Sequence, residues 1–398
     1  MQHEYAFSLP QPDAVSAAHS ERCADYIRER IRDAGGSISF AEFMHYALYA
    51  PGLGYYSAGS RKFGAAGDFV TAPELGSVFA RCVARPLAAV GAALGEWDLL
   101  EIGAGTGALA AELLEALGPE HAPRRYLILE RSADLRAVQQ QRLAGLAPRL
   151  RAAVTWLAEP PEKDWDGVLL ANEVLDALPV ERFRIASDGL EQLGVELGAE
   201  LGEDVPRWTA RPAPEALARE LRRRLGPELD RLGPGYVSEL CTLLAPWLER
   251  VTAGLRRGLA LLIDYGYPRR EYYRPERADG TLVCHYRHRA HGDPFWWPGL
   301  QDLSAFVDFT AVAEAGVDAG LELLGYTSQA QFLIACGLEE VLAGLAELPQ
   351  RARLERAREV RELTLPGAMG ERFQCMALGR GLEKPLRGFD GIDLGHRL

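Results

Sequence analysis

The chain has 398 residues, of which 48% are hydrophobic and 25% are charged, and its formal net charge at pH 7 is −12. This composition is typical of a globular protein with one or two domains, and no apolar run is long enough to span a membrane. The acidic balance argues against a nucleic-acid partner that is held by phosphate contacts.

Residues 1–13 carry acids and prolines but no apolar core, so they resemble neither a secretory signal nor an arginine-rich transit peptide. We therefore expect a cytoplasmic location in a bacterium, or the mitochondrial matrix if a presequence has been removed from a eukaryotic protein. Two amphipathic helices are expected next, at residues 17–34 and 40–48, because apolar residues recur on one face of each.

A glycine-rich loop, residues 64–74, follows these helices. Its length and composition are typical of a lid or a binding loop. The loop contains Asp68 and ends in Thr71, Pro73 and Glu74, which could equally cap the helix that is expected at residues 74–94. The two interpretations are compatible.

Residues 97–117 are expected to form the centre of the fold. Their sequence predicts an apolar strand, then a loop with three glycines, then a helix. The loop contains Glu101, Gly103, Gly105 and Gly107. Glycine permits backbone angles that other residues avoid and places no Cβ in the way of a ligand. The loop matches both a relaxed dinucleotide fingerprint and an S-adenosylmethionine loop. The acid two residues before the first glycine favours the second, since it can meet the amino group of the methionine part.

Three further strands are expected at residues 126–130, 154–157 and 167–170, with a helix at residues 132–146. Crossover helices between such strands imply a parallel sheet. Glu130 ends the first of these strands, where a carboxylate commonly accepts hydrogen bonds from two ribose hydroxyls.

Polar residues follow the fourth strand directly. Asn172, Glu173 and Asp176 are expected at the edge of the sheet where ligands bind. The alternative is a helix that Asn172 caps, with Glu173 in its first turn. A fifth strand at residues 259–263 ends in Asp264, which we place at the same edge.

The segment between the fourth and fifth strands, about residues 180–257, is predicted to be an insertion. It contains a hairpin at residues 183–197, which turns at residues 187–189, and helices at residues 215–225 and 238–256.

A long loop of about residues 265–312 follows the fifth strand, and its residues 302–309 are expected to cap a helix. Its cysteine and histidines fit no paired zinc pattern, so no metal site is expected: Cys284, His285, His288 and His291. The last strands are expected at residues 321–327 and 373–378, before a loosely held tail.

Several unusual motifs occur together in this chain, at residues 43–56, 67–74, 101–107, 172–179, 264–266 and 299–303. Together they resemble the MidA family of class I S-adenosylmethionine-dependent methyltransferases, over about residues 20–380. The chain departs from the family pattern at Phe306, where many relatives carry histidine.

The resemblance implies an α/β, Rossmann-like fold with a mostly parallel seven-stranded sheet. It divides the chain into an N-terminal helical and lid region (residues 1–95), a methyltransferase core with the insertion after its fourth strand (residues 96–380), and a C-terminal tail (residues 381–398). It also implies methyl transfer from S-adenosyl-L-methionine to an arginine of a protein substrate, with S-adenosyl-L-homocysteine as product. In mitochondrial members that substrate is a subunit of respiratory complex I.

This reaction needs carboxylates that grip the guanidinium and aim one of its nitrogens at the methyl group. We expect Glu173 to do so, with Asp68, Asp176 and Asp264 as helpers. The donor is expected to contact the glycine loop, Glu130, and a further set of residues: Glu101, Asn172, Thr71, Pro73 and Glu74. The sequence does not predict the oligomeric state.

Two other functions stay open on the sequence alone. An NAD-dependent oxidoreductase could use the same glycine loop, but it needs a second nucleotide-binding half, which residues 180–257 do not resemble. A non-catalytic assembly factor could retain a vestigial donor site, although the intact glycines and Glu130 argue against it.

Overall fold

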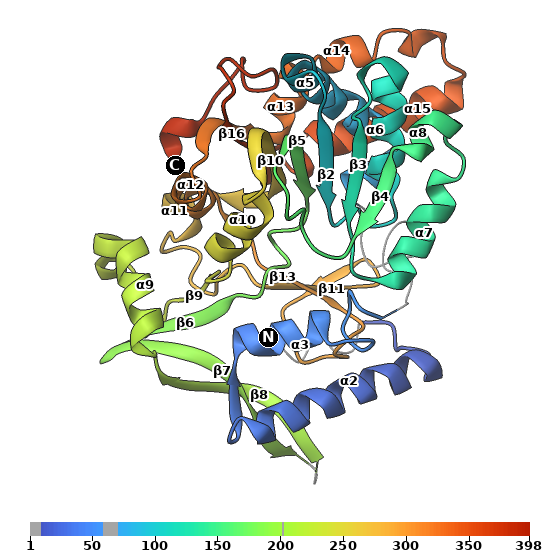
Figure 1. Ribbon diagram of the computed structural model, residues 1–398. Coiled ribbons are helices and arrows are strands. Elements are labelled where there is room, and N and C mark those ends of the chain that lie inside the picture. Colours follow the sequence, from blue (N-terminus) through green and yellow to red (C-terminus); the bar gives the residue numbers. More distant parts are fainter. Residues whose placement is uncertain (1–8, 59–70, 201–202) are drawn as a thin grey trace. The chain divides into compact units, whose positions relative to one another are not determined.

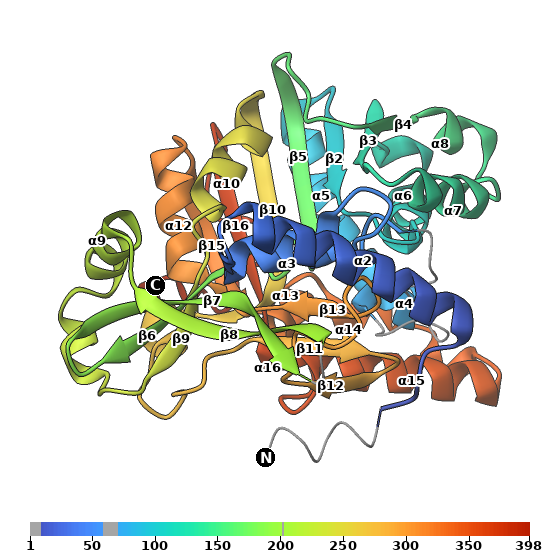
Figure 2. The same ribbon diagram turned by 90° about the horizontal axis from the view of Figure 1, so that it is seen from below.

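The computed structural model describes residues 9–58, 71–200 and 203–398, which fall into two compact units (Figures 1 and 2). Unit 1 contains the described residues of Met1–Phe69, Ala177–Leu243 and Arg270–Phe306. Unit 2 contains those of Val70–Asp176, Leu244–Arg269 and Val307–Leu398. The expected insertion and long loop thus supply much of unit 1, and the domain boundaries at residues 95 and 380 stay a prediction.

Unit 2 is built on a sheet with the strand order β15-β16-β10-β5-β2-β3-β4, and β14 pairs with the end of β10 (Figures 1 and 2). The strands are β2 (Asp98–Ile102), β3 (Arg125–Leu129), β4 (Val154–Leu157), β5 (Trp165–Asn172), β10 (Leu255–Tyr267), β14 (Val307–Asp308), β15 (Glu322–Ser328) and β16 (Phe373–Arg380). Strands β4, β3, β2, β5 and β10 are parallel, whereas β16 is antiparallel to both of its neighbours. The predicted fold class, a mostly parallel seven-stranded α/β sheet, is confirmed.

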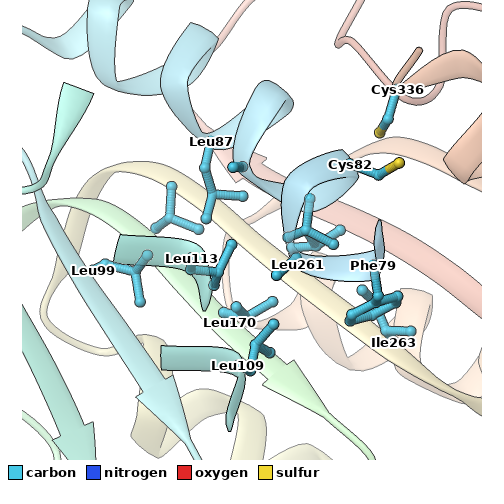
Figure 3. Close-up of a cluster of buried hydrophobic side chains, with 14 of the residues drawn as sticks. Phe79, Cys82, Leu87, Leu99, Leu109, Leu113, Leu170, Leu261, Ile263 and Cys336 are labelled. Carbon is cyan, nitrogen blue, oxygen red and sulfur yellow. The ribbon is translucent and has the colours of Figure 1, made fainter. Parts of the chain in front are cut away.

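The side chains of successive strand residues point to opposite faces of this sheet, and helices cover both faces. The helices are α4 (Ala72–Leu75), α5 (Val78–Leu94), α6 (Ala108–His121), α7 (Ala133–Leu143), α8 (Pro148–Ala152), α10 (Leu244–Thr252), α12 (Phe309–Asp318), α13 (Gln329–Ala335), α14 (Leu338–Val341), α15 (Gln350–Thr364) and α16 (Met369–Arg372), with short 3-10 turns η2 (Leu345–Glu347) and η3 (Gly395–Arg397). On one face, side chains of α5 and α6 form a buried cluster with those of the central strands (Figure 3): Phe79, Leu87, Leu109, Leu113, Leu99, Leu170, Leu261 and Ile263. On the other face α12 approaches β16 so closely that a Cβ at Gly316 would lie 2.7 Å from Leu378 Cδ1.

Unit 1 contains a mixed set of helices and antiparallel strands. One sheet has the order β1-β7-β6-β9, with β8 paired to β7, and the other has the order β12-β11-β13. The strands are β1 (Ser37–Ser39), β6 (Glu181–Ala186), β7 (Gly189–Glu200), β8 (Glu203–Pro212), β9 (Val237–Leu240), β11 (Val283–Tyr286), β12 (Arg289–His291) and β13 (Asp302–Ser304). Helices α2 (Ala14–Asp33) and α3 (Phe40–Tyr49) pack beside β7 (Figure 2), and α9 (Glu215–Leu225), η1 (Gly226–Arg231) and α11 (Arg269–Tyr272) complete the helices.

Three expectations about local structure need correction. The helix expected at residues 74–94 is two helices, α4 and α5, separated at Gly76 and Ser77. The helix expected at residues 238–256 is strand β9 followed by the shorter helix α10. The helix cap expected within residues 302–309 is confirmed, since the Asp308 side chain accepts a hydrogen bond from the amide of Ala311 at the start of α12.

The third correction concerns the C-terminal tail, which is not loosely held. Leu386 and Phe389 are buried, and Phe389 packs against Phe332 of α13.

Across the described ranges, no one helix combines the length and apolar character needed to cross a bilayer. A bent pair, residues 329–335 and 338–347 at 71° to each other, meets both criteria together.

Candidate active site

The carboxyl ends of β2, β3, β5 and β10 lie side by side in unit 2, and we call this the carboxyl edge. Ile102 of β2 pairs with both Leu129 of β3 and Ala171 of β5, while Ile263 of β10 pairs with Asn172. Between β2 and β5 the chain reverses the direction in which it adds strands, which is where ligands bind in open α/β sheets. Gly103, Glu130 and Glu173 directly follow β2, β3 and β5, and Asp264 of β10 is next to Ile263, so these four residues meet at this edge.

The three glycines after β2 are required by the backbone conformation. Gly103, Gly105 and Gly107 have φ angles of 67°, 54° and 81°, a region that residues with a Cβ rarely adopt. Close packing adds to the requirement at two of them. A Cβ would lie 3.1 Å from Val174 Cγ2 at Gly103 and 3.3 Å from Gln139 Cα at Gly107.

Glu101 is buried at the end of β2, with only 2% of its surface exposed. Burial raises the pKa of its carboxyl group from 4.5 to about 7, although a hydrogen bond from the Tyr126 hydroxyl, at 2.8 Å, favours the charged form. The expected contact between Glu101 and the amino group of the donor stays a prediction.

Glu130 follows β3, and its carboxylate is held by two donors. The amide of Ser132 donates to Oε1 at 2.8 Å, and Gln139 Nε2 donates to Oε2 at 3.2 Å. Gln139 Nε2 also donates to the carbonyl oxygen of Gly105 at 2.9 Å, so this side chain joins the acid to the glycine loop. Sequence reasoning missed Gln139 because it stands in a run of three glutamines, whose other two members are exposed.

No helix begins after β5, so the interpretation of Asn172 as a helix cap is wrong. Instead Glu173 adopts a φ of 54°, which costs a residue with a Cβ about 1–2 kcal/mol. Asn172 Nδ2 donates to Glu173 Oε1 at 3.1 Å, and Asn172 Oδ1 is buried without a hydrogen-bond partner among the described residues. Strained residues with unsatisfied polar neighbours are concentrated at functional sites.

Asp264 holds the loop that follows Glu173. Its side chain is fully buried, and its Oδ2 accepts hydrogen bonds from three consecutive amides, those of Val174 (3.0 Å), Leu175 (2.8 Å) and Asp176 (3.3 Å). Burial and then the nearby charge of Glu173 raise the pKa of Asp264, against the effect of these amides. The Tyr265 hydroxyl donates to the carboxylate of Asp176. Asp264 therefore binds the loop from β10, and Asp176, which belongs to the loop, is bound by Tyr265 of the same strand.

The residues before α5 reach the glycine loop through Glu74. Its Oε1 accepts a hydrogen bond from Arg142 Nη1 at 2.9 Å and another from the Thr106 hydroxyl. Thr71 precedes α4 as expected, but its side chain makes no capping hydrogen bond, and Pro73 lies in the first turn. Donor contacts of Thr71 and Pro73 stay predictions.

Two further expectations concern other parts of the chain. Asp68 and most of the loop at residues 64–74 lie outside the described residues, so their roles stay predictions. Within the ranges that the structure describes, no group of three or more His, Cys, Asp or Glu side chains could hold a metal ion. Cys284 and His291 face each other across β11 and β12, and Cys284 is buried.

The carboxyl edge fits an adenosine-containing donor. The glycine loop leaves backbone open to a ligand, and the Glu130 carboxylate is fixed beside it at the position where ribose hydroxyls are bound in such sheets. Glu173 supplies a second carboxylate two strands away, on the far side of β2. The arrangement can therefore hold a donor at one carboxylate and a cationic acceptor at the other.

Comparisons with known proteins identify the family. Residues 78–327 match the family described as "Putative S-adenosyl-L-methionine-dependent methyltransferase". The chain is 44% identical to a protein from Burkholderia thailandensis whose crystal structure contains S-adenosyl-homocysteine, with a TM-score of 0.91 over 98% of this chain and 100% of that one. It is 27% identical to the mitochondrial protein arginine methyltransferase NDUFAF7 homolog of Caenorhabditis elegans, over 93% of this chain and 89% of that one. The Danio rerio protein arginine methyltransferase NDUFAF7 is 28% identical, over 87% and 84%.

These findings confirm the resemblance noted from the motifs. The family match covers more than half of the chain, and the glycine loop and the strands that carry it lie within the matched residues. The chain belongs to this family of S-adenosyl-L-methionine-dependent methyltransferases.

Proposed function

We propose that the chain transfers a methyl group from S-adenosyl-L-methionine to an arginine guanidinium of a protein substrate. The names of the curated relatives support arginine as the acceptor. The observation that carries the proposal is Glu173, a carboxylate in a strained backbone conformation directly after the central strand β5.

The chemistry explains why a carboxylate is needed there. Arginine stays protonated at neutral pH, and its lone pairs are delocalised over three nitrogens. Paired N–H bonds to Glu173 would draw the positive charge toward two nitrogens and aim the remaining lone pair. Asn172 Nδ2 orients the Glu173 carboxylate, and Asn172 Oδ1, which has no hydrogen-bond partner among the described residues, can accept a further N–H bond from the guanidinium.

Methyl transfer needs positioning and the removal of one proton. The donor supplies the methyl group, and the attacking nitrogen forms the new N–C bond as the C–S bond breaks, leaving S-adenosyl-L-homocysteine. One proton then leaves that nitrogen for water, while Glu173 stays paired with the other two nitrogens. In this proposal Asp264 acts through the loop that it holds, and Asp176 acts through Tyr265.

The acceptor protein follows from the family resemblance. We propose a respiratory complex I subunit, or its bacterial equivalent, as the substrate. The curated relatives carry mitochondrial names and the Burkholderia protein is bacterial, so the two compartments expected from the sequence both stay predictions.

The dinucleotide alternative finds no support in the observed architecture. The chain between β5 and β10 forms the antiparallel strands β6, β7, β8 and β9 together with α9, rather than a second nucleotide-binding half.

Titration calorimetry with S-adenosylmethionine, S-adenosylhomocysteine and NAD tests the donor. We expect both sulfur compounds to bind and NAD not to bind. Binding of NAD alone would favour the oxidoreductase, and binding of none of the three would leave the vestigial interpretation. Incubation with methyl-labelled donor and a purified complex I peripheral arm, followed by acid hydrolysis, tests the acceptor. Label in methylarginine supports the proposal, and label confined to another amino acid contradicts it.

A further inference from the structure

We propose that Gln139 is a positioning residue that holds the glycine loop and Glu130 in the geometry needed for the donor. This inference rests on the proposed placement of the donor between that loop and Glu130. Gln139 lies on α7 and belongs to none of the motifs that carry the family resemblance.

All polar atoms of the Gln139 side chain are engaged. Nε2 donates to the Gly105 carbonyl at 2.9 Å and to Glu130 Oε2 at 3.2 Å, while Oε1 accepts from Trp156 Nε1 at 2.8 Å. These partners fix the orientation of the amide. Reversing it would turn its oxygen toward a carbonyl and a carboxylate, and its NH₂ toward a donor.

The position of Gln139 makes this connection hard to replace. Its side chain is completely buried, and its Cα would lie 3.3 Å from a Cβ at Gly107. A buried amide is costly unless it is fully hydrogen-bonded, so an apolar side chain would serve better if packing were its only task. The two atoms that it joins, on Gly105 and Glu130, belong to the two donor-binding elements. We infer that Gln139 sets the distance between them.

Gln139→Leu tests this role, with Gln140→Leu as a matched control. Both changes remove a glutamine from the same helix, but Gln140 is exposed. We expect Gln139→Leu to weaken S-adenosylhomocysteine binding about tenfold or more, since a hydrogen bond to a charged group is lost. The KM for the donor should rise while kcat at saturating donor stays within about twofold. Gln140→Leu should bind normally.

Gln139→Glu gives a readout that a structural role alone would not produce. Two buried carboxylates would then face each other, and burial and the charge of Glu130 would raise the pKa of the introduced group. When protonated, the introduced acid can donate to Glu130 as the amide does, and when ionised it repels Glu130. Donor affinity of Gln139→Glu should therefore recover toward that of the unmodified protein as pH falls from 8 to 5.5. This pH comparison also decides the matter if Gln139→Leu fails to fold.

Glu130→Ala distinguishes an error in the proposed donor site from an error in the proposed role of Gln139. If Glu130→Ala binds the donor normally, the proposed donor site is wrong. If Glu130→Ala weakens binding but Gln139→Leu behaves like Gln140→Leu, the donor site stands and the role of Gln139 is overturned. The same conclusion follows if the affinity of Gln139→Glu, relative to the unmodified protein, does not change with pH.

Discussion

At the scale of single residues, Glu173 combines a strained backbone with the side chain proposed to bind the acceptor. Its φ of 54° is maintained because the next three amides are bound by one buried carboxylate, that of Asp264. Strain that is imposed by surrounding contacts in this way costs stability and fixes a functional side chain.

Comparing Glu173→Gly with Glu173→Ala measures this strain. Both variants lose the carboxylate, so neither should transfer methyl groups. Glycine adopts the left-handed conformation without steric cost, so Glu173→Gly should be more stable than Glu173→Ala by about 1 kcal/mol in urea unfolding. A Glu173→Ala protein as stable as Glu173→Gly would show that the backbone is unstrained.

Glu101 gives a prediction about pH. Burial raises its pKa in the folded chain to about 7 from 4.5, so the folded state binds the proton more tightly than the unfolded state. The contribution of Glu101 to stability is therefore fully present below about pH 4.5 and is lost as pH rises to about 7. Relative to Glu101→Gln, the donor-free protein should lose up to about 3 kcal/mol of unfolding free energy over this range. If the difference in unfolding free energy between the unmodified protein and Glu101→Gln is the same at pH 5 and pH 7.5, the prediction is wrong.

At the scale of elements, helix α6 allows a comparison of two glycines, one at its start in the glycine loop and one near its end. Gly107 and Gly118 both lie at positive φ, at 81° and 62°, but only Gly107 has close neighbours at its Cβ position. Alanine at either position should cost about 1 kcal/mol of stability. Only Gly107→Ala should also weaken donor binding, by about tenfold, because its methyl group pushes against Gln139, which we propose positions the donor site. Equal donor affinities of the two variants, measured by calorimetry, would count against the assigned loop.

Elements with a clear hydrophobic period were predictable from the sequence. Strand β4 and helix α9 have the bounds expected for them, and the β6–β7 hairpin turns at the expected residues. Strand β9 was mistaken for helix because Ser238 and Glu239 interrupt its apolar pattern. Glu239 is nonetheless buried, since Arg182 Nε and the amide of Thr281 donate to its carboxylate. Arg182 and Thr281 are distant from Glu239 in the sequence, so no local pattern predicts these contacts.

At the scale of the whole molecule, the parallel sheet followed from the crossover helices, and so did the meeting of polar residues at the carboxyl edge. The make-up of unit 1 did not, because it depends on pairs such as Ile38 with Val195. The contacts of Gln139 and Asp264 could not be predicted for a similar reason, since each is made with a distant segment. Glu173 and the glycines, by contrast, could be placed at the carboxyl edge from their position directly after a strand.

The central claim is that Glu173 prepares an arginine for methyl transfer, and single-turnover transfer from labelled S-adenosylmethionine to a native acceptor subunit tests it most directly. Glu173→Gln keeps the size of the side chain but removes its charge, and Glu115→Gln, at an exposed position of α6, is the control. The account predicts normal donor binding in both variants, normal transfer by Glu115→Gln, and a loss of on the order of 10² or more in the transfer rate of Glu173→Gln. Equal transfer rates for Glu173→Gln and the unmodified protein would contradict it.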